Sequence, residues 1–220
     1  MTFFSYLREL WRGKDLYRIL MNTECVHHTI KGKTLDVGSG LQLASYHRFL
    51  KRDPGAVIER VDLGFEEGSG GRRIDLEKDA LPRADGSADT VLLFNVLEHI
   101  YNYQHLLAEI QRILKPGGQI LGAVPFLVAY HPDPHDYWRF TKETLEKIFI
   151  VVRFTNIEIK SFGYGPGVAA FSQMEPVLPR LLKILLLPKT LLFDWLVLKF
   201  RPNKMNKDKF PLGLFFVVKK

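Results

Sequence analysis

Two histidines and two aspartates alternate with prolines in the segment HPDPHD, residues 131–136. Imidazole can accept a proton near neutral pH, and a neighbouring carboxylate can orient it. We therefore predict that His135 is a general base assisted by Asp136, although both residues could serve only to fix this loop. The density of polar and aromatic residues here is typical of a binding pocket, and an arginine can bind an anionic group through two hydrogen bonds. Substrate contacts are expected from His131, Tyr137 and Arg139.

A second candidate for the base is His99, in the segment LEHI, which follows a predicted strand ending at Asn95. Its imidazole could meet a substrate or hold a loop through a backbone hydrogen bond. Imidazole and carboxylate groups also bind metal ions, so His99, His131, His135 and Asp136 raise the question of a metal site. The proline-rich loop lacks a helical frame that would converge its histidines. We therefore predict that no metal is bound.

The segment LDVGSG, residues 35–40, predicts a short buried strand followed by a glycine turn. Gly38 and Gly40 let the backbone turn tightly and approach a ligand with no Cβ in the way. A dinucleotide-binding turn of the G-x-G-x-x-G type would place a third glycine at position 43, where this chain has leucine. The turn therefore indicates a nucleotide site of a different kind.

Helices and strands alternate along the chain, which predicts a mostly parallel α/β sheet with helices on both faces. Helices are expected over residues 1–22, 41–50 and 103–114, with Thr141 as the N-cap of a further one; strands are expected over 35–37, 56–63, 72–76, 90–95, 119–125, 154–161 and 213–220.

Ligands of such sheets bind at the carboxyl ends of the strands, where polar residues of this chain are concentrated. Asp36 could also merely cap its own turn. The predicted cofactor contacts are Asp36, Gly38, Ser39, Gly40, Asp62, Leu63, Asp75, Leu76 and Asn95.

The stretch from Leu35 to Pro125 resembles the class I S-adenosylmethionine-dependent methyltransferases. The resemblance is to the small-molecule O-methyltransferases, including bacterial proteins of surface polysaccharide or lipid biosynthesis that carry a similar PHDYxRFT segment. It rests on the segments LDVGSG, VDLG, DLEKDALPRADGSADTVLLFNVLEHI and LLAEIQRILKPGGQILGAVP in one order.

The resemblance implies a Rossmann-like seven-stranded sheet whose last strand is antiparallel and lies between the fifth and sixth. It implies S-adenosylmethionine as the cofactor, with its methionine end at the glycine turn and the amides of the first helix. Asp62 would accept both ribose hydroxyls, Asp75 and Leu76 would border the adenine, and Asn95 would face the methionine.

We therefore expect a methyltransferase that acts on a hydroxyl of a small or lipid-linked acceptor, such as a saccharide or its precursor. The alternative is a non-catalytic S-adenosylmethionine-binding protein that uses the histidine loop as a docking surface. A dehydrogenase is a third hypothesis, which the missing glycine weakens.

The chain of 220 residues fits one domain. We expect an N-terminal helical segment (1–30), a cofactor-binding core (31–162), a helical insertion or lid (163–209) and a final strand (210–220).

The single cysteine, Cys25, excludes an intrachain disulfide, and charged residues interrupt the first 20 positions, where a signal peptide would need an apolar core. These features favour the cytoplasm.

Excess positive charge is concentrated in residues 179–220, which hold ten Lys or Arg and two Asp of a chain whose net charge is +7. Leucines and aromatic residues alternate with these cations over 178–200, and every window of 18 residues there contains charge, which argues against a membrane span. The segment suits either an anionic membrane surface, at the inner face of the membrane, or a lid or dimer interface. Because leucine interrupts the basic residues, nucleic acid is not an expected partner. The oligomeric state stays open.

Overall fold

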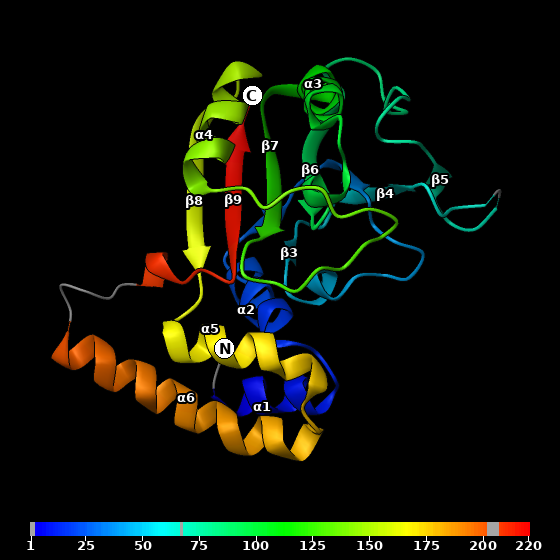
Figure 1. The fold of residues 1–220 in the computed structure, drawn as a ribbon. Coiled ribbons are helices and arrows are strands. Elements are labelled where there is room, and N and C mark those ends of the chain that lie inside the picture. The colour runs from blue at the N-terminus through cyan, green and yellow to red at the C-terminus, as the bar shows by residue number, and fades with distance from the viewer. Residues whose placement is uncertain (1–2, 67, 202–206) are drawn as a thin grey trace.

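The computed structural model describes residues 3–66, 68–201 and 207–220. Within them, a seven-stranded sheet has the order β5-β4-β2-β6-β7-β9-β8 (Figure 1). Neighbouring strands are parallel except at β9, which is antiparallel to both β7 and β8. The predicted Rossmann-like sheet and the position of its last strand are confirmed. The strands are β1 (Thr29–Ile30), β2 (Lys33–Val37), β3 (Lys51–Arg52), β4 (Val57–Asp62), β5 (Arg72–Arg73), β6 (Ala88–Phe94), β7 (Leu114–Pro125), β8 (Thr155–Phe162) and β9 (Gly213–Lys219).

Helices cover both faces of this sheet. The central strand β6 ends in the apolar run 91–94 and is buried except at Asp89, as expected of a strand covered on both sides. On one face, α3 and α4 bury Leu106, Ile110 and Phe149; on the other, α2 and α5 bury Ile19 and Phe171. The helices are α1 (Phe3–Trp11), α2 (Leu16–Cys25), α3 (Tyr103–Ile113), α4 (Lys142–Val151), α5 (Pro166–Met174) and α6 (Arg180–Phe200), with 3₁₀ turns η1 (Ser45–Arg48), η2 (Leu97–His99), η3 (Glu175–Val177) and η4 (Lys207–Lys209). Thr141 caps α4 as predicted, accepting from the Thr144 amide at 3.2 Å.

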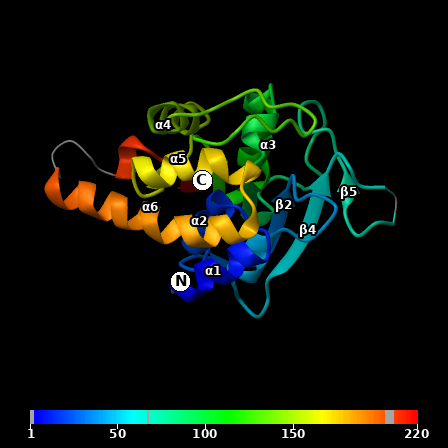
Figure 2. The same cartoon turned by 60° about the horizontal axis from the view of Figure 1, so that its bottom comes forward.

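A helical cap, formed by α1, α5, η3 and α6, lies beyond the carboxyl ends of β6 and β7 (Figures 1 and 2). Asp194 connects α6 to α5 within the cap. Its buried carboxylate accepts hydrogen bonds from the amides of Gly167 and Val168, at 2.7 and 2.9 Å, in the first turn of α5. An acidic group stabilises a helix N-terminus, where amides lack acceptors. The helical segment predicted before the last strand is therefore present, although its residues 202–206 lie outside the described ranges.

The helix predicted over 41–50 is wrong: this stretch contains only the short turn η1. The carbonyl oxygens of Gly40 and Leu41, which a helix would use as acceptors, instead accept from the guanidinium of Arg60 at 2.5 and 3.2 Å. The neighbouring side chains of Leu41 and Leu43 are about 60% exposed, so burial does not favour a helix there either.

Two other predicted elements differ from those observed. The N-terminal helix is divided into α1 and α2 at Gly13, whose φ of +80° lies in the left-handed region that favours glycine; residues 1–2 of the prediction lie outside the described ranges. The strand predicted over 72–76 extends only over β5, since Asp75 and the residues after it form turns.

Glu175, in η3, makes the stability of the cap dependent on pH. Its buried carboxylate accepts from the Leu16 amide at 2.8 Å and lies 4.0 Å from Lys183. Burial raises its pKa from 4.5 to about 7, with Asp15 adding to the rise and the Leu16 amide and Lys183 opposing it. Because the folded state holds this proton more tightly than the unfolded state, its contribution to stability is full below about pH 4.5 and is lost as pH rises through 7.

In the parent protein, the free energy of unfolding should fall between pH 5 and pH 8 as Glu175 loses its proton. Glu175→Gln keeps an acceptor for Leu16 but cannot ionise, so we expect this fall to be smaller in the variant by about 1 to 3 kcal/mol. Denaturant unfolding at both pH values measures this. An equal change at the two pH values would contradict the expectation.

Candidate functional site

Two cavities meet at the carboxyl edge of the sheet. The first, the strand-end cavity, has a volume of about 770 Å³ and is bordered by the ends of β2, β4 and β6. The second, the cap cavity, has a volume of about 710 Å³ and extends from the same edge to α2 and η3. Both are lined by Gly38, Gly40, Asn95, His99 and Asp133. The two cavities therefore adjoin at these residues, including Asn95 and His99.

The glycine turn after β2 forms the floor shared by the cavities. Gly38 has a φ of +64°, and a Cβ placed on it would lie 2.4 Å from a methyl carbon of Val96. Gly40 has a φ of +66°. Glycine is therefore required at Gly38 by both conformation and space, as the sequence predicted. Ser39, between them, lines the cap cavity.

Asp62 ends β4 and faces the strand-end cavity. Its two carboxylate oxygens accept one hydrogen bond each, at 2.9 Å, from the amides of Gly40 and Gly64. A carboxylate oxygen can accept more than one hydrogen bond, so this arrangement orients Asp62 and leaves it capacity for a ligand. The Gly40 contact also fixes the glycine turn against the end of β4.

The strand-end cavity is also lined by Leu63, Asp75 and Leu76. Asp75 accepts from the amide of Glu77 at 3.0 Å and from Lys78 at 3.1 Å, and the Lys78 ammonium lowers the pKa of the Asp75 carboxyl. Asp75 is therefore ionised at neutral pH.

Asp36 takes a different position from the other predicted cofactor contacts. Its fully buried carboxylate accepts from the Tyr46 hydroxyl and pairs with His47 Nε2, both at 2.7 Å. Within the described part of the chain, it lines neither cavity. Asp36 fixes η1 beneath the glycine turn.

Asn95 follows β6 with a φ of +55°, which only a minority of non-glycine residues adopt. Its side chain accepts a hydrogen bond from the Tyr17 hydroxyl, and its amide nitrogen lies 3.7 Å from the sulfur of Met21. Two residues of α2 thus hold Asn95 where the cavities meet.

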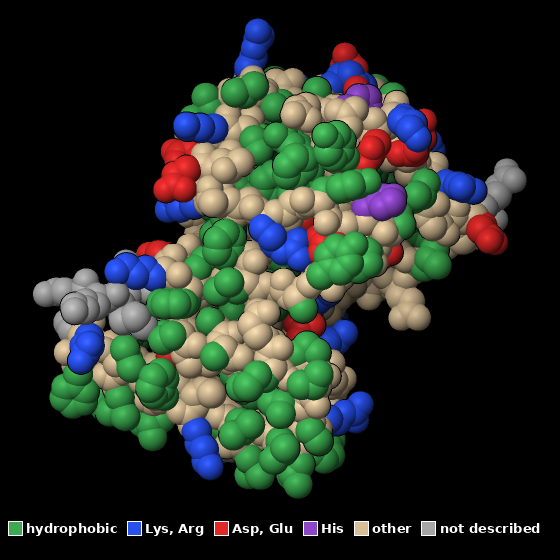
Figure 3. Space-filling model, viewed as in Figure 1, with side chains coloured by type: hydrophobic (Ala, Val, Ile, Leu, Met, Phe, Trp, Pro, Cys, Tyr) green, Lys and Arg blue, Asp and Glu red, His purple; other side chains and the backbone are tan. Residues whose placement is uncertain are grey.

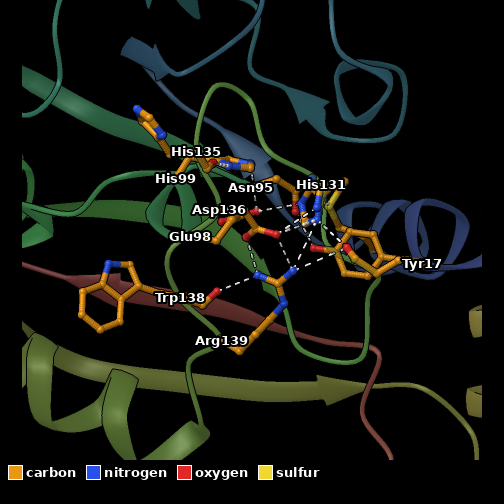
Figure 4. Close-up of polar contacts among 11 residues, drawn as sticks. Tyr17, Asn95, Glu98, His99, His131, His135, Asp136, Trp138 and Arg139 are labelled. Atoms are coloured by element: carbon orange, nitrogen blue, oxygen red, sulfur yellow. Dashed lines mark hydrogen bonds and ion pairs between the residues drawn. The ribbon is translucent and has the colours of Figure 1, made fainter.

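A cluster of Glu98, His99 and His131 lies beside Asn95 (Figure 4). Glu98 is fully buried, and its Oε1 lies 3.7 Å from His99 Nε2 and 4.0 Å from His131 Nε2. Burial raises the pKa of Glu98 to about 8. His99 and His131 come from the β6 end and from the histidine loop, so the fold brings together two predicted site residues that are distant in sequence.

The remaining residues of the histidine loop are held differently. Asp136 pairs with Arg139 through both oxygens, at 2.5 and 2.7 Å, and also accepts from the His131 amide at 2.9 Å. Hydrogen bonds from Arg139 lower the pKa of Asp136 to about 2. Since this carboxylate occupies both terminal nitrogens of Arg139, the predicted anion-binding group is already engaged within the protein.

His135 directs its backbone carbonyl to His99 Nδ1, and its ring packs 5.2 Å from the Tyr137 ring. Its imidazole points away from the cluster (Figure 4). His135 and Tyr137 line the strand-end cavity, whereas His131 lines the cap cavity.

The sequence reasoning missed several residues of the site. Glu98 adjoins His99 in LEHI, but a glutamate in a short turn is ordinarily solvated, and nothing in the pattern indicates full burial. Tyr17, Arg18 and Lys183 line the cap cavity from helices whose docking the sequence does not specify. The sequence signal available for these three residues was the density of aromatic and basic residues in their segments.

Residues 35–122 match a family model described as a methyltransferase domain. A curated protein of Mycolicibacterium smegmatis, a probable S-adenosylmethionine-dependent methyltransferase, is 36% identical over 52 residues, which cover 24% of this chain and 20% of that protein. The chain thus spans about a fifth of the length of this relative.

Solved structures share the fold at low identity. A S-adenosylmethionine-dependent methyltransferase from Archaeoglobus fulgidus has a TM-score of 0.58 and 16% identity, with both chains fully covered. Phosphoethanolamine N-methyltransferase 2 of Haemonchus contortus, bound to S-adenosylmethionine, has a TM-score of 0.53 and 18% identity over 92% of this chain and 52% of its own. The matched residues 35–122 contain the glycine turn, Asp62, Asp75 and Asn95, and the chain shares its fold with S-adenosylmethionine-dependent methyltransferases.

Proposed function

We propose that this protein is an S-adenosylmethionine-dependent methyltransferase whose acceptor is a hydroxyl group of a small or lipid-linked molecule, such as a saccharide or its precursor. The observation that carries this proposal is the meeting of two cavities at Asn95 and His99, one bordered by strand-end carboxylates and the other by a histidine–glutamate cluster. Such a pair of cavities suits the donor and the acceptor of a transfer reaction.

The strand-end cavity fits the donor. Its volume of about 770 Å³ lies in the usual range for ligand sites, and the glycine turn leaves backbone at its wall. Gly38, Ser39 and Gly40 would hold the methionine end, Asp62 the ribose hydroxyls, and Asp75 with Leu63 and Leu76 the adenine. When bound, S-adenosylmethionine supplies a methyl group carried on a positively charged sulfur.

The cluster beside Asn95 suits a hydroxyl acceptor, which must lose a proton as it is methylated. The acceptor oxygen forms a bond to the methyl carbon, the sulfur–carbon bond breaks with its electron pair left on sulfur, and the hydroxyl proton passes to a base. His99 lines both cavities and turns Nε2 inward, which supports the assignment of this step to the cluster. His135, with Asp136, stays a prediction for the same role.

The cap cavity supports an acceptor that carries negative charge and a sugar-like surface. Arg18 and Lys183 line it, and no hydrogen bond or ion pair of the Arg18 guanidinium is found among the described residues. Tyr46 and Tyr130 add aromatic surface. A phosphorylated saccharide, free or on a lipid carrier, matches these groups. Arg18 and Lys183 suit its phosphate better than Arg139, which is paired with Asp136.

Mass spectrometry of the lipid and glycan pools of cells with and without the protein tests the proposal. We expect species heavier by one methyl group only where the protein is present, and a variant lacking His99 should abolish them. Identical pools, together with binding of S-adenosylmethionine by the purified protein, would instead favour the non-catalytic alternative.

A membrane surface is the proposed source of a lipid-linked acceptor. Apolar side chains gather over the helical cap, with lysine and arginine among them (Figure 3). On α6, Leu181, Leu185, Leu192 and Trp195 are each more than half exposed. No helix among the described residues is long and apolar enough to cross a membrane. An apolar surface with cations at its border suits the interface of an anionic bilayer, and we propose that the protein acts there from the cytoplasmic side.

We expect the protein to sediment with vesicles in proportion to their anionic lipid content, and to be released by salt, because each cation near the surface contributes about 1 kcal/mol and is screened. Replacing Leu181, Leu185 and Leu192 with serine should abolish sedimentation, whereas serine at Val57, an exposed residue of β4, should not. If instead the parent protein ignores such vesicles at low salt and forms a dimer that the leucine variant loses, these leucines form a protein interface.

A further inference from the structure

Three metal-ligating side chains converge beside Asn95, where the cavities meet. The ligand atoms of Glu98, His99 and His131 all lie within 4.8 Å of one another. Glu98 and His99 lie in η2, directly after the carboxyl end of β6, whereas His131 comes from the loop after β7 (Figure 4). The two parallel strands therefore bring the groups together.

Both imidazoles are held with the same nitrogen facing inward. His99 Nδ1 contacts the backbone carbonyl of His135, and His131 Nδ1 contacts that of Ala129 at 2.9 Å. A carbonyl oxygen can only accept, so each neutral ring carries its proton on Nδ1 and presents the Nε2 lone pair to Glu98. Carbonyl partners of this kind fix the tautomer and orientation of histidines that bind metals.

The carboxylate of Glu98 lacks the partner that its burial requires. Among the described residues, neither of its oxygens has a hydrogen-bond partner, and the inward-facing nitrogens at 3.7 and 4.0 Å are beyond hydrogen-bond range. Buried polar groups are almost always paired, because leaving them unpaired is costly. Three potential ligand atoms thus face a common point, and within the described ranges no hydrogen bond of the protein satisfies the oxygens of Glu98 there.

We propose that Glu98, His99 and His131 bind one divalent first-row transition metal ion, such as Zn²⁺ or Mn²⁺. Two imidazoles and a carboxylate are a ligand set that such ions favour. Ligands at about 2.1 Å from a tetrahedral ion lie about 3.4 Å apart. The two separations from Glu98, 3.7 and 4.0 Å, are close to this value, and the two imidazole nitrogens lie within 4.8 Å of each other. This proposal departs from the expectation of no metal, which was based on His99, His131, His135 and Asp136 and did not include Glu98.

Three protein ligands leave the ion at least one open position, which is typical of catalytic sites. His99 lines both cavities and His131 lines the cap cavity, so that position faces the proposed acceptor. The role of the ion rests on the proposed function and changes its proton transfer: with His99 Nε2 bound to the ion, an acceptor oxygen bound to the ion would release its proton to water instead of to His99. Binding of the ion does not depend on that function.

Calorimetric titration of the chelator-treated full chain with Zn²⁺ or Mn²⁺ tests the site, with the visible spectrum of bound Co²⁺ reporting the ligands. We expect one ion per chain, and at least about a hundredfold weaker binding in Glu98→Gln and in His131→Ala. His135→Ala is the matched control, because it keeps the backbone carbonyl and loses only a neighbouring imidazole that is not a proposed ligand.

Absence of binding at micromolar metal, or equal binding by the parent and both ligand variants, would overturn the site. Circular dichroism of each metal-free variant establishes that it is folded; if Glu98→Gln is not, the partly exposed His131 carries the test. Methyl transfer that is absent while one ion is bound would reject the proposed function alone, and transfer that persists in the presence of chelator would reject the role of the ion.

Discussion

Alanine at Asp62 is expected to weaken the binding of S-adenosylhomocysteine, measured by calorimetry, by about 5- to 150-fold. This range corresponds to the 1 to 3 kcal/mol lost when a group in a binding site is left without its hydrogen-bond partner. The loss has two sources, because Asp62 faces the strand-end cavity and also accepts from the amides of Gly40 and Gly64. Asp62→Asn keeps one acceptor oxygen, and with it one of the two amide contacts, so we expect it to lose less affinity than Asp62→Ala.

The control is Asp53→Ala, which removes an exposed carboxylate on the turn before β4. It should bind the ligand as the parent protein does. If Asp62→Ala also binds with unchanged affinity, the nucleoside does not lie against β4 and the proposed orientation of the cofactor is wrong.

Alanine at His99 is expected to lower the rate of methyl transfer by about a hundredfold or more, the size of a lost general base. The ring faces Glu98 and lines both cavities, so the reaction loses either a proton acceptor or a metal ligand. Single-turnover kinetics with saturating donor isolates the chemical step from binding.

His135→Ala is the informative comparison, because the sequence places the base first on that residue. Its ring packs against Tyr137 outside the cluster, so we expect the smaller loss. His27→Ala, an exposed histidine after α2, should have no effect on the rate. If His135→Ala lowers the rate of methyl transfer more than His99→Ala does, His135 is the base, as the sequence predicts.

The strands and the glycine turn could be predicted because local pattern specifies them. An apolar run such as β6 is buried on both faces in a parallel sheet, and the polar residues after each strand reach the same edge whatever the loops do. Asp62, Asp75 and Asn95 therefore lie at the strand-end cavity as expected. The position of β9 was predicted only through the family resemblance, since antiparallel insertion is a long-range property.

Contacts between distant segments account for what the sequence did not predict. The helix expected over 41–50 is absent, and at its predicted start the carbonyl oxygens of Gly40 and Leu41 accept from Arg60 on a neighbouring strand. Asp36 is withdrawn from the cavities by Tyr46 and His47. Glu98 became a candidate only when the fold placed it, buried, opposite an imidazole from a loop 33 residues away.

The most direct test of the proposed reaction is to identify the atom that receives the methyl group. The purified protein is incubated with S-adenosylmethionine carrying a ¹³C-labelled methyl group and the lipid and glycan fraction of cells that lack the protein, and the products are analysed by carbon–proton correlation NMR. We predict a labelled methyl carbon bonded to oxygen, on a phosphorylated or lipid-linked saccharide, and no such signal with His99→Ala. Label on nitrogen or carbon, or none in any fraction, would contradict the account.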